Sequence, residues 1–292
     1  MDAKQRFTQK TASIVKLLRP EQYYKNLVIF LAIFFSGKLF EENLLLLLAL
    51  GFFSLCLASS SAYILNDILD RKRDALNSEK SGRPIAHGDI SIITASLISL
   101  LLVALSLSAS YFINKLFFLS VSAYLVISAC YSLFMKNEIL LDIITISVNF
   151  VIRAISGAFI ANVWISPWLV MGTFFLALFM ATGKRKCEFV FLGRNATKHR
   201  KVLSMYSKEI TDSLACITTT ALLMSYALYC FLVNSRLMVT LPIVVYAILR
   251  YLLLIYSGSE KARMPGKMLL DKRMLASVAI YAVISFFAIY YG

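Results

Sequence analysis

The sequence predicts an all-α protein that crosses a membrane about nine times. Hydrophobic residues make up 59% of the 292 residues, and only 16% are charged. The mean hydropathy is +0.75, whereas a soluble domain of this length needs a much more polar surface. Apolar runs of about 18 or more residues, the length that crosses about 30 Å of hydrocarbon, recur along nearly the whole chain.

The expected spans follow one another closely. A basic amphipathic arm over residues 1–26 precedes the first of them, and the sixth is short. They lie at 27–40, 44–65, 92–113, 116–135, 139–162, 168–183, 212–233, 237–256 and 273–291. The arm has no apolar core and no cleavage site, so the first span is expected to act as an uncleaved insertion signal. Without a repeat or a linker, we expect a single domain over 1–292.

The basic residues indicate how the chain is oriented. The formal net charge is +14, from 30 basic and 16 acidic residues. With a cytoplasmic N-terminus, 25 of the 30 basic residues fall on the cytoplasmic side, and only Lys38, Lys115 and Arg236 on the other. This split follows the positive-inside rule. The sequence therefore predicts an inner-membrane protein with its N-terminus inside and its C-terminus outside, and it needs no nucleic-acid partner to explain its charge.

Cysteine and histidine give no sign of a metal site. Cys56, Cys130, Cys216 and Cys230 lie singly in apolar spans, and Cys187 is the single cysteine of a basic loop. No pair has the spacing of a zinc site, so neither disulfides nor a cysteine metal centre are expected.

The expected cytoplasmic loops are longer than is needed to connect neighbouring spans. We expect loops at 66–91, 184–211 and 257–272, whereas the outer connections are short and nearly neutral. Long polar loops gathered on one face indicate a cap or the rim of an active site.

An acidic cluster emerges from the second span. If helicity continues, Asn66, Asp70 and Asp74 recur at every fourth position, and Asp67 lies on the same side. Carboxylates on one face repel each other unless a cation lies between them, and hard oxygen ligands suit Mg²⁺. The sequence therefore predicts a magnesium site formed by these four side chains.

A second interpretation of the cluster is a solvated helix end. Asn66 would then cap the helix, and the carboxylates would pair with the basic residues at 71–73. Lys80 and Arg83 follow across a turn, where an anion could be shared between a metal and their side chains. We expect both to bind substrate, although such spacing alone is also typical of ordinary cytoplasmic charge.

Polar residues inside the spans suggest a cavity. Arg153 lies in the fifth span, where a charged residue marks a cavity or an ion pair. It could contact a phosphate or form a clamp with Asp142. Tyr131 could reach the same cavity or belong to an interfacial aromatic belt. Arg250 lies near the cytoplasmic end of the eighth span, where snorkelling explains it.

The acidic motif resembles that of a known family. The pattern N-D-x-x-D-x-x-x-D at 66–74, followed by K-x-x-R-P at 80–84, is similar to the first aspartate-rich motif of the UbiA-type intramembrane prenyltransferase superfamily. The similarity extends over essentially the whole chain. It implies a helical bundle around a central cavity, capped by cytoplasmic loops, in which Mg²⁺ holds a diphosphate.

The chain departs from most of that superfamily after the sixth span. A second aspartate-rich motif is expected there, but G-K-R-K-C-E at 183–188 holds a single acid. More cations follow, namely Arg194, Lys198, Arg200 and Lys201. This pattern resembles the branch of decaprenyl-phosphate phosphoribosyltransferases, as do L-R-P-x-Q-Y-Y-K-N at 18–26 and D-K-R at 271–273.

The resemblance to that branch implies a set of site residues. Asp67, Asp70, Lys184 and Arg185 are expected to be catalytic. The expected substrate-binding residues are Lys25, Asn26, Lys80, Arg83, Tyr131, Arg153, Glu188 and Arg250.

The expected reaction is the Mg²⁺-dependent transfer of 5-phosphoribose from phosphoribosyl pyrophosphate to a polyprenyl phosphate. Bringing two polyanions together at low dielectric requires fixed cations, which the basic segment after the sixth span supplies. One alternative is a prenyltransferase that moves an allylic group from its diphosphate to an aromatic or other small acceptor. A transporter is disfavoured because the polar clusters gather on one face instead of through the depth of several spans.

Overall fold

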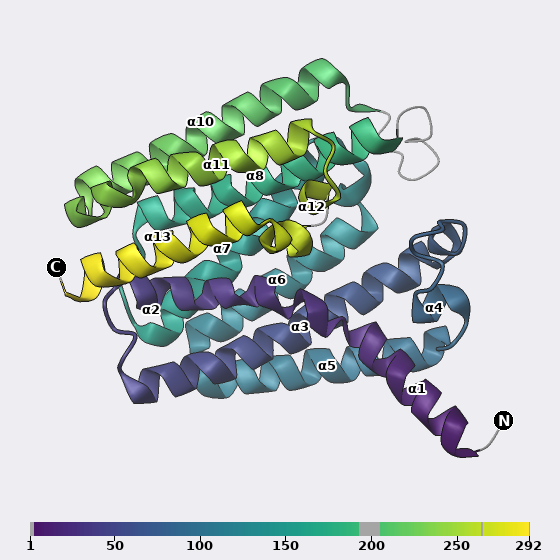
Figure 1. Cartoon of the computed structure of the whole chain (residues 1–292). Coiled ribbons are helices and arrows are strands. Elements are labelled where there is room, and N and C mark those ends of the chain that lie inside the picture. The colour runs from purple at the N-terminus through teal and green to yellow at the C-terminus, as the bar shows by residue number, and fades with distance from the viewer. Residues whose placement is uncertain (1–2, 193–204, 264, 292) are drawn as a thin grey trace. The chain divides into compact units, whose positions relative to one another are not determined.

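The computed structural model describes residues 3–192, 205–263 and 265–291, and all the regular elements in these ranges are helices (Figure 1). The predicted all-α class is confirmed. Eight described helices are long and apolar enough to cross a membrane. They are Glu42–Ala75, Ile92–Ile113, Lys115–Leu133, Leu141–Ala161, Pro167–Val190, Lys208–Leu232, Ser235–Tyr256 and Lys272–Tyr290.

The first expected span, 27–40, takes a different form. After α1 (Ala3–Leu18), the chain forms a 3₁₀ helix, η1 (Pro20–Phe30), and then α2 (Leu31–Phe35). Pro20 fits the first position of η1 because its missing N–H would lack a helical partner there. Ile29 and Ile33 are fully buried, so this segment packs into its unit. The count of nine spans stays a prediction.

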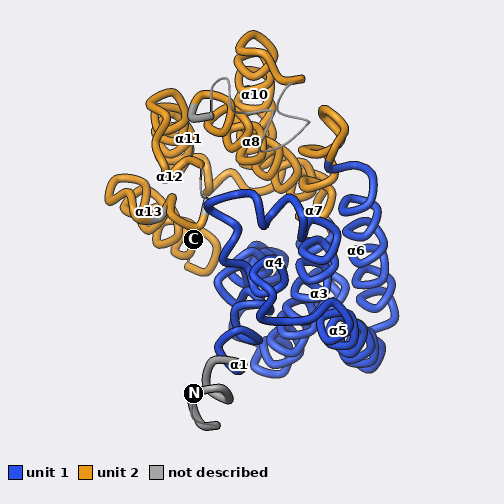
Figure 2. The backbone as a smooth tube through the Cα atoms, turned by 90° about the vertical axis from the view of Figure 1, so that its right-hand side faces the viewer, with its two compact units in different colours: residues 1–136, 152–163 blue, residues 137–151, 164–292 orange. Residues whose placement is uncertain are grey.

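The chain divides into two compact units (Figure 2). Residues 1–136 and 152–163 form the first unit, and residues 137–151 and 164–292 form the second. The helix α7 (Leu141–Ala161) contributes to both. The expected single domain, the central cavity and the cap of loops stay predictions.

In the first unit, α3 (Glu42–Ala75) packs against α5 (Ile92–Ile113) and α6 (Lys115–Leu133). Small hydroxyl side chains join α3 to α5. Ser106 donates to the backbone oxygen of Ser54 at 2.8 Å, and the hydroxyls of Ser61 and Ser99 lie 2.9 Å apart. Serines allow membrane helices to approach closely and supply hydrogen bonds between them.

A glycine on α7 allows a still closer approach in the same unit. A Cβ atom at Gly157 would lie 1.8 Å from the backbone oxygen of Ile29 and 2.8 Å from its carbonyl carbon. Backbone atoms cannot move aside as a side chain can, so only glycine fits at this contact between α7 and η1.

The second unit contains α8 (Pro167–Leu192), α10 (Lys208–Leu232), α11 (Leu241–Tyr256) and α13 (Lys272–Tyr290). α8 packs against α10, and α11 lies beside α13 (Figure 1). The connections include η5 (Ser235–Thr240), α12 (Glu260–Arg263) and η6 (Pro265–Leu270). Buried side chains of α8, α11, α12 and α13 form a common apolar cluster that includes Phe179, Cys187, Tyr251, Ile255, Ala262 and Met274.

Two helices continue beyond the spans that hydropathy predicts. α3 runs through Ala75, so the acidic motif lies on a helix, as its spacing suggested. α8 runs through Leu192, so the basic motif at 183–188 is also helical and does not open a loop. A short helix, α4 (Pro84–His87), follows the turn after α3.

Replacing Gly157 by alanine should destabilise the first unit. The new methyl group would overlap the backbone of Ile29, and such overpacking costs about 1–3 kcal/mol or more. Gly172→Ala is the matched control, because a Cβ there meets nothing within 4 Å and alanine favours a helix. Thermal unfolding of the detergent-solubilised protein measures both variants. Equal stability of the two variants would contradict the assigned contact.

Candidate active site

The acidic motif on α3 contacts a cation from the following turn. Arg83 Nη1 lies 2.9 Å from Asp67 Oδ1 and 2.6 Å from Asp74 Oδ2, so one guanidinium bridges both carboxylates. Asp67 and Asp74 are each only 2% exposed. Their seven-residue spacing places them two turns apart on one face of α3, as expected from the sequence.

A second guanidinium reaches Asp67 from the N-terminal arm. Arg19 Nη2 lies 2.6 and 2.8 Å from the two carboxylate oxygens. Arg19 joins α1 to η1 in the left-handed conformation, with φ of 53°, immediately before Pro20. Its guanidinium also lies 5.4 Å from the ring centroid of Tyr63, a cation–π contact.

The other half of the motif binds a lysine. Lys136 Nζ donates to Asp70 Oδ1 at 2.8 Å and to Asn66 Oδ1 at 3.1 Å. This lysine is 4% exposed and belongs to η2 (Met135–Asn137), just after α6. Arg73 adds a longer ion pair to Asp70 at 3.7 Å. The four oxygen-bearing side chains therefore form two pairs, Asp67 with Asp74 and Asn66 with Asp70.

The acidic motif on α3 has side chains that could help to hold a metal ion. In the described part of the chain, no three His, Cys, Asp or Glu side chains are grouped as an all-protein metal site would require. Mg²⁺, however, usually takes only one or two carboxylates and completes its shell with phosphate oxygens and water. The Asp67–Asp74 pair already converges on a cation, the Arg83 guanidinium. The donor set and its charge therefore fit Mg²⁺ bound together with a phosphorylated ligand.

Other predicted residues of the first unit lie along a separate chain of hydrogen bonds. Arg153 Nη2 donates to Tyr124 at 2.8 Å, Tyr124 donates to Ser59 at 3.3 Å, and Ser59 donates to Asn26 at 3.2 Å. All four side chains are buried. This network connects α7, α6, α3 and η1. The Arg153–Asp142 clamp stays a prediction.

Three more of the predicted site residues belong to the first unit. Lys25 Nζ lies 6.0 Å from the ring centroids of both Tyr24 and Tyr63. Lys80 is half-buried in the turn before Arg83, whose N–H donates to the Lys80 carbonyl at 2.9 Å. Tyr131 is half-buried in the last turns of α6.

The second unit holds a buried ion pair between α7 and α8. Arg185 Nε donates to Asp142 Oδ2 at 2.6 Å, and Arg185 Nη1 donates to Glu188 at 2.6 Å. The Asp142 side chain is 0% exposed and that of Arg185 is 3% exposed. Tyr206 donates to the other oxygen of Asp142 at 2.9 Å, and burial raises the pKa of its phenol, which therefore stays protonated as the donor.

Lys184 and Lys186 differ sharply in exposure. The Lys184 side chain is 43% exposed and its Nζ lies 3.9 Å from Glu188. Lys186 is buried, forms an ion pair with Asp212, and lies 3.2 Å from the ring centroid of Tyr256. The further predicted cations of this segment, Arg194, Lys198, Arg200 and Lys201, lie outside the described residues.

Arg250 is held by an acid at the start of α13. Its guanidinium binds both oxygens of Asp271, at 3.2 and 2.8 Å, and Asp271 also caps α13 by accepting from the Met274 N–H. The hydrogen bonds from Arg250, followed by that from Met274, lower the pKa of Asp271 to about 2. Asp271 is therefore ionised at neutral pH, so the pair stays charged.

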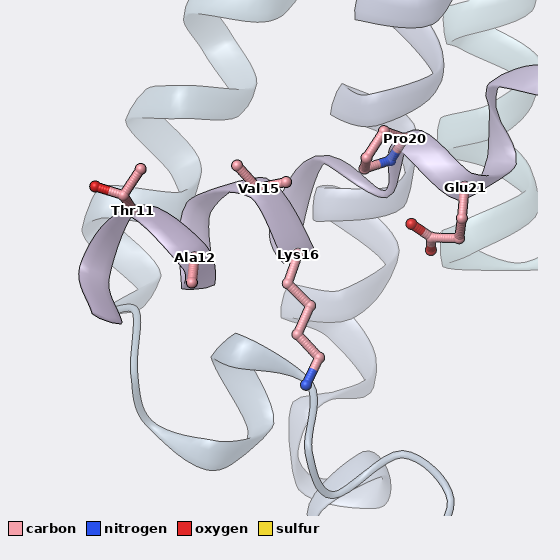
Figure 3. A pocket seen from close by; sticks show the side chains of 6 residues that line it. All are labelled: Thr11, Ala12, Val15, Lys16, Pro20 and Glu21. Atoms are coloured by element: carbon pink, nitrogen blue, oxygen red, sulfur yellow. The ribbon is translucent and has the colours of Figure 1, made fainter. Parts of the chain in front are cut away.

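A shallow hollow of about 490 Å³ lies at the bend between α1 and η1 (Figure 3). Its lining residues are Thr11, Ala12, Val15, Lys16, Pro20 and Glu21, none of which is a predicted site residue. The Lys16 side chain extends away from the bend, and its amine lies near Gly82, beside the turn that carries Lys80.

Sequence reasoning did not place Arg19 and Lys136 in the site. In the sequence both contribute to the cytoplasmic charge, and Arg19 also belongs to the stretch at 18–26. A signal was present for each, because Arg19 directly precedes a proline and Lys136 is a single cation after an apolar span. The sequence suggests Arg153 as a partner for Asp142, and within the second unit Asp142 pairs with Arg185.

The model of the UbiA prenyltransferase family matches residues 27–270. The chain belongs to this family. It is 31% identical to a decaprenyl-phosphate phosphoribosyltransferase of Mycolicibacterium smegmatis over 224 residues, 75% of this chain and 70% of that protein. It is also 31% identical to the enzyme of that name from Corynebacterium glutamicum, over 75% of this chain and 67% of that protein.

Solved structures share the fold. A UbiA homolog from Archaeoglobus fulgidus, bound to GPP and Mg²⁺, superposes with a TM-score of 0.73 at 22% identity, covering 95% of this chain and 99% of that one. A structure of digeranylgeranylglyceryl phosphate synthase gives 0.69 at 17% identity, with the same coverage. Together with the eight apolar helices, family membership makes the chain a multi-pass membrane protein of an enzyme family.

Removing the Asp142 carboxylate should strongly destabilise the second unit. Asp142→Ala leaves the buried Arg185 without one of its anionic partners, and breaking a buried pair from one side costs about 3–5 kcal/mol. The double variant Asp142→Ala with Arg185→Ala should lose less than the sum of the two single variants. Detergent-phase unfolding measures the cycle, and simple additivity would show that the pair is not coupled.

Proposed function

We propose that the protein transfers 5-phosphoribose from phosphoribosyl pyrophosphate to a polyprenyl phosphate, releasing pyrophosphate. The observation that carries this proposal is the 31% identity to enzymes named decaprenyl-phosphate phosphoribosyltransferase over 75% of the chain. Two features of the described residues support it. An acidic pair accompanied by guanidinium groups suits a magnesium diphosphate, and α8 carries the cations that a second phosphorylated reactant requires.

In this proposal the acidic end of α3 holds the donor. Asn66, Asp67, Asp70 and Asp74 would bind Mg²⁺, which neutralises charge on the pyrophosphate. Arg83 and Lys80 stabilise the pyrophosphate as it leaves, because guanidinium and ammonium groups bind phosphate oxygens strongly. Asn26, Tyr131 and Arg153 are assigned to substrate binding.

The acceptor supplies its own nucleophile. Lys25, Lys184 and Arg185 are assigned to presenting the lipid phosphate, and Glu188 and Arg250 to substrate binding. One of its oxygens bonds to the anomeric carbon of the ribose as the bond from that carbon to the pyrophosphate oxygen breaks. Because a phosphate monoester is ionised at neutral pH, the step needs no strong general base. Positioning and electrostatic stabilisation then supply the catalysis, with inversion at that carbon.

The proposed location follows from the charge distribution. With the N-terminus inside, most basic residues face the cytoplasm, which places the reaction at the inner face of the cell membrane. A soluble phosphorylated donor would reach the acidic motif from the cytoplasm, and the lipid acceptor would enter from the bilayer.

Labelled phosphoribosyl pyrophosphate tests the reaction. Membranes or purified protein supplied with this donor, polyprenyl phosphate and Mg²⁺ should give label in the lipid extract. Absence of labelled lipid, together with transfer from a prenyl diphosphate to a small acceptor, would favour the second candidate. That candidate, an allylic prenyltransferase, is supported by the shared fold with a structure bound to GPP and Mg²⁺.

Changing the acidic motif should abolish turnover. Asp67→Asn and Asp70→Asn keep the size of the side chain and remove the charge that would hold Mg²⁺, so we expect a rate loss of at least about 100-fold. Because Asp67 is paired with Arg19 and Arg83, and Asp70 with Lys136, unfolding of each variant in detergent separates a loss of activity from a loss of folding. The Mg²⁺ concentration needed for half-maximal rate should rise in any residual activity. Glu79→Gln, in the exposed turn that follows α3, is the control. Full activity in either aspartate variant would remove the metal assignment.

Lys184→Ala should weaken the binding of an anionic substrate more than it affects folding. Loss of one charge-assisted contact corresponds to about a tenfold rise in KM for that substrate. Lys38→Ala is a closely matched control, since the side chains of Lys184 and Lys38 are 43% and 44% exposed, and each lies 3.8–3.9 Å from a glutamate. Unchanged KM for both substrates would count against the role of Lys184.

A further inference from the structure

A groove runs between two membrane-spanning helices of the second unit. It measures about 340 Å³ and lies between α11 and α13. Pro242, Ile243 and Tyr246 form one wall. Arg273, Ala276, Ser277 and Ile280 form the other. The small side chains of Ala276 and Ser277 create the hollow, and the apolar walls are exposed, with Tyr246 at 47% and Ile280 at 50%.

The groove faces away from the interior of the unit. The cluster that contains Tyr251, Ile255 and Met274 packs α11 and α13 against α8, and these residues are 7% exposed or less. Ser277 forms the floor of the groove, because it is 4% exposed and its hydroxyl donates to the Met274 carbonyl, whereas Tyr246 and Ile280 lie on exposed faces of the same two helices. Tyr246 and Ile280 are exposed on two candidate membrane spans, and such an apolar surface suits a lipid acyl chain.

One end of the groove carries positive charge that suits an anionic ligand. Arg273 and the neighbouring Lys272 are both exposed in the first turn of α13. Among the residues that the structure describes, no carboxylate forms an ion pair with either of them. The nearby acid Asp271 is bound to Arg250, Lys261 and the Met274 N–H. The groove thus joins a cationic end to an apolar body.

We infer that this groove binds an anionic phospholipid of the surrounding membrane. The Arg273 guanidinium would bind the lipid phosphate, and one acyl chain would lie along Tyr246, Ala276 and Ile280. A guanidinium offers paired donors to phosphate oxygens, and two adjacent cations favour a lipid of net negative charge over a zwitterionic one. The groove residues are not themselves assigned to the proposed reaction. Arg250, which is assigned to it, lies one turn after Tyr246 and is bound to Asp271, so the test compares a phospholipid with a polyprenyl phosphate.

Native mass spectrometry of the full-length protein in detergent tests the site with phosphatidylglycerol, phosphatidylcholine and a polyprenyl phosphate as probes. We expect one phosphatidylglycerol to bind in preference to phosphatidylcholine. Arg273→Ala should weaken this binding about fivefold, the effect of about 1 kcal/mol for one cation at a membrane surface. Ala276→Phe keeps the charge but fills the hollow, and should weaken binding to a similar extent.

Arg236→Ala is the matched control, because Arg236 is exposed at the opposite end of the span that contains α11. It should bind phosphatidylglycerol as the unaltered protein does. Retained binding in Arg273→Ala or Ala276→Phe, or an equal loss in Arg236→Ala, would overturn the site. Arg273-dependent binding of polyprenyl phosphate in preference to phosphatidylglycerol would overturn the assigned occupant.

Discussion

The structure depends on the pairing of charges where little water can reach them. At the end of α3, Asp67 and Asp74 are almost completely buried, and their charge is tolerated because Arg19 and Arg83 contact them directly. Asp70 is stabilised in the same way by Lys136. An isolated charge in a medium of low dielectric is very costly, so each carboxylate also fixes the segment that carries its cation. Electrostatic pairing therefore ties the N-terminal arm, the turn after α3 and the end of α6 to one helix.

The same pairing suits the proposed chemistry. A metal-bound diphosphate would bring a cation for the carboxylates and an anion for the guanidinium groups, so both halves of each ion pair would find new partners when the donor binds. The cost of separating Arg83 from Asp67 and Asp74 would then be largely offset. In the second unit, by contrast, Arg185 is buried between Asp142 and Glu188, which indicates that it also positions α7 against α8.

Local patterns predicted much of this molecule. Hydropathy located the long spans, and helical periodicity placed Asp67 and Asp74 on one face, because both depend on residues close in sequence. The partners of the acidic motif were not predictable in this way. Arg19 lies 48 positions before Asp67, and Lys136 lies 66 positions after Asp70, so their contacts depend on tertiary packing. The segment at 27–40 has the composition of a span, yet it forms parts of η1 and α2, in which Ile29 and Ile33 are buried and Leu27 is exposed.

The length of α3 has a consequence for the environment of its acidic end. Its 34 residues extend about 51 Å, whereas the hydrocarbon layer is about 30 Å thick. Asp67 lies about 37 Å along the helix from Glu42, so with the helix near the bilayer normal its carboxylate stands at the level of the lipid head groups. The length of this one helix thus sets how deep the carboxylates lie. A thicker bilayer would bring the carboxylates closer to the acyl chains and so raise the cost of keeping them charged.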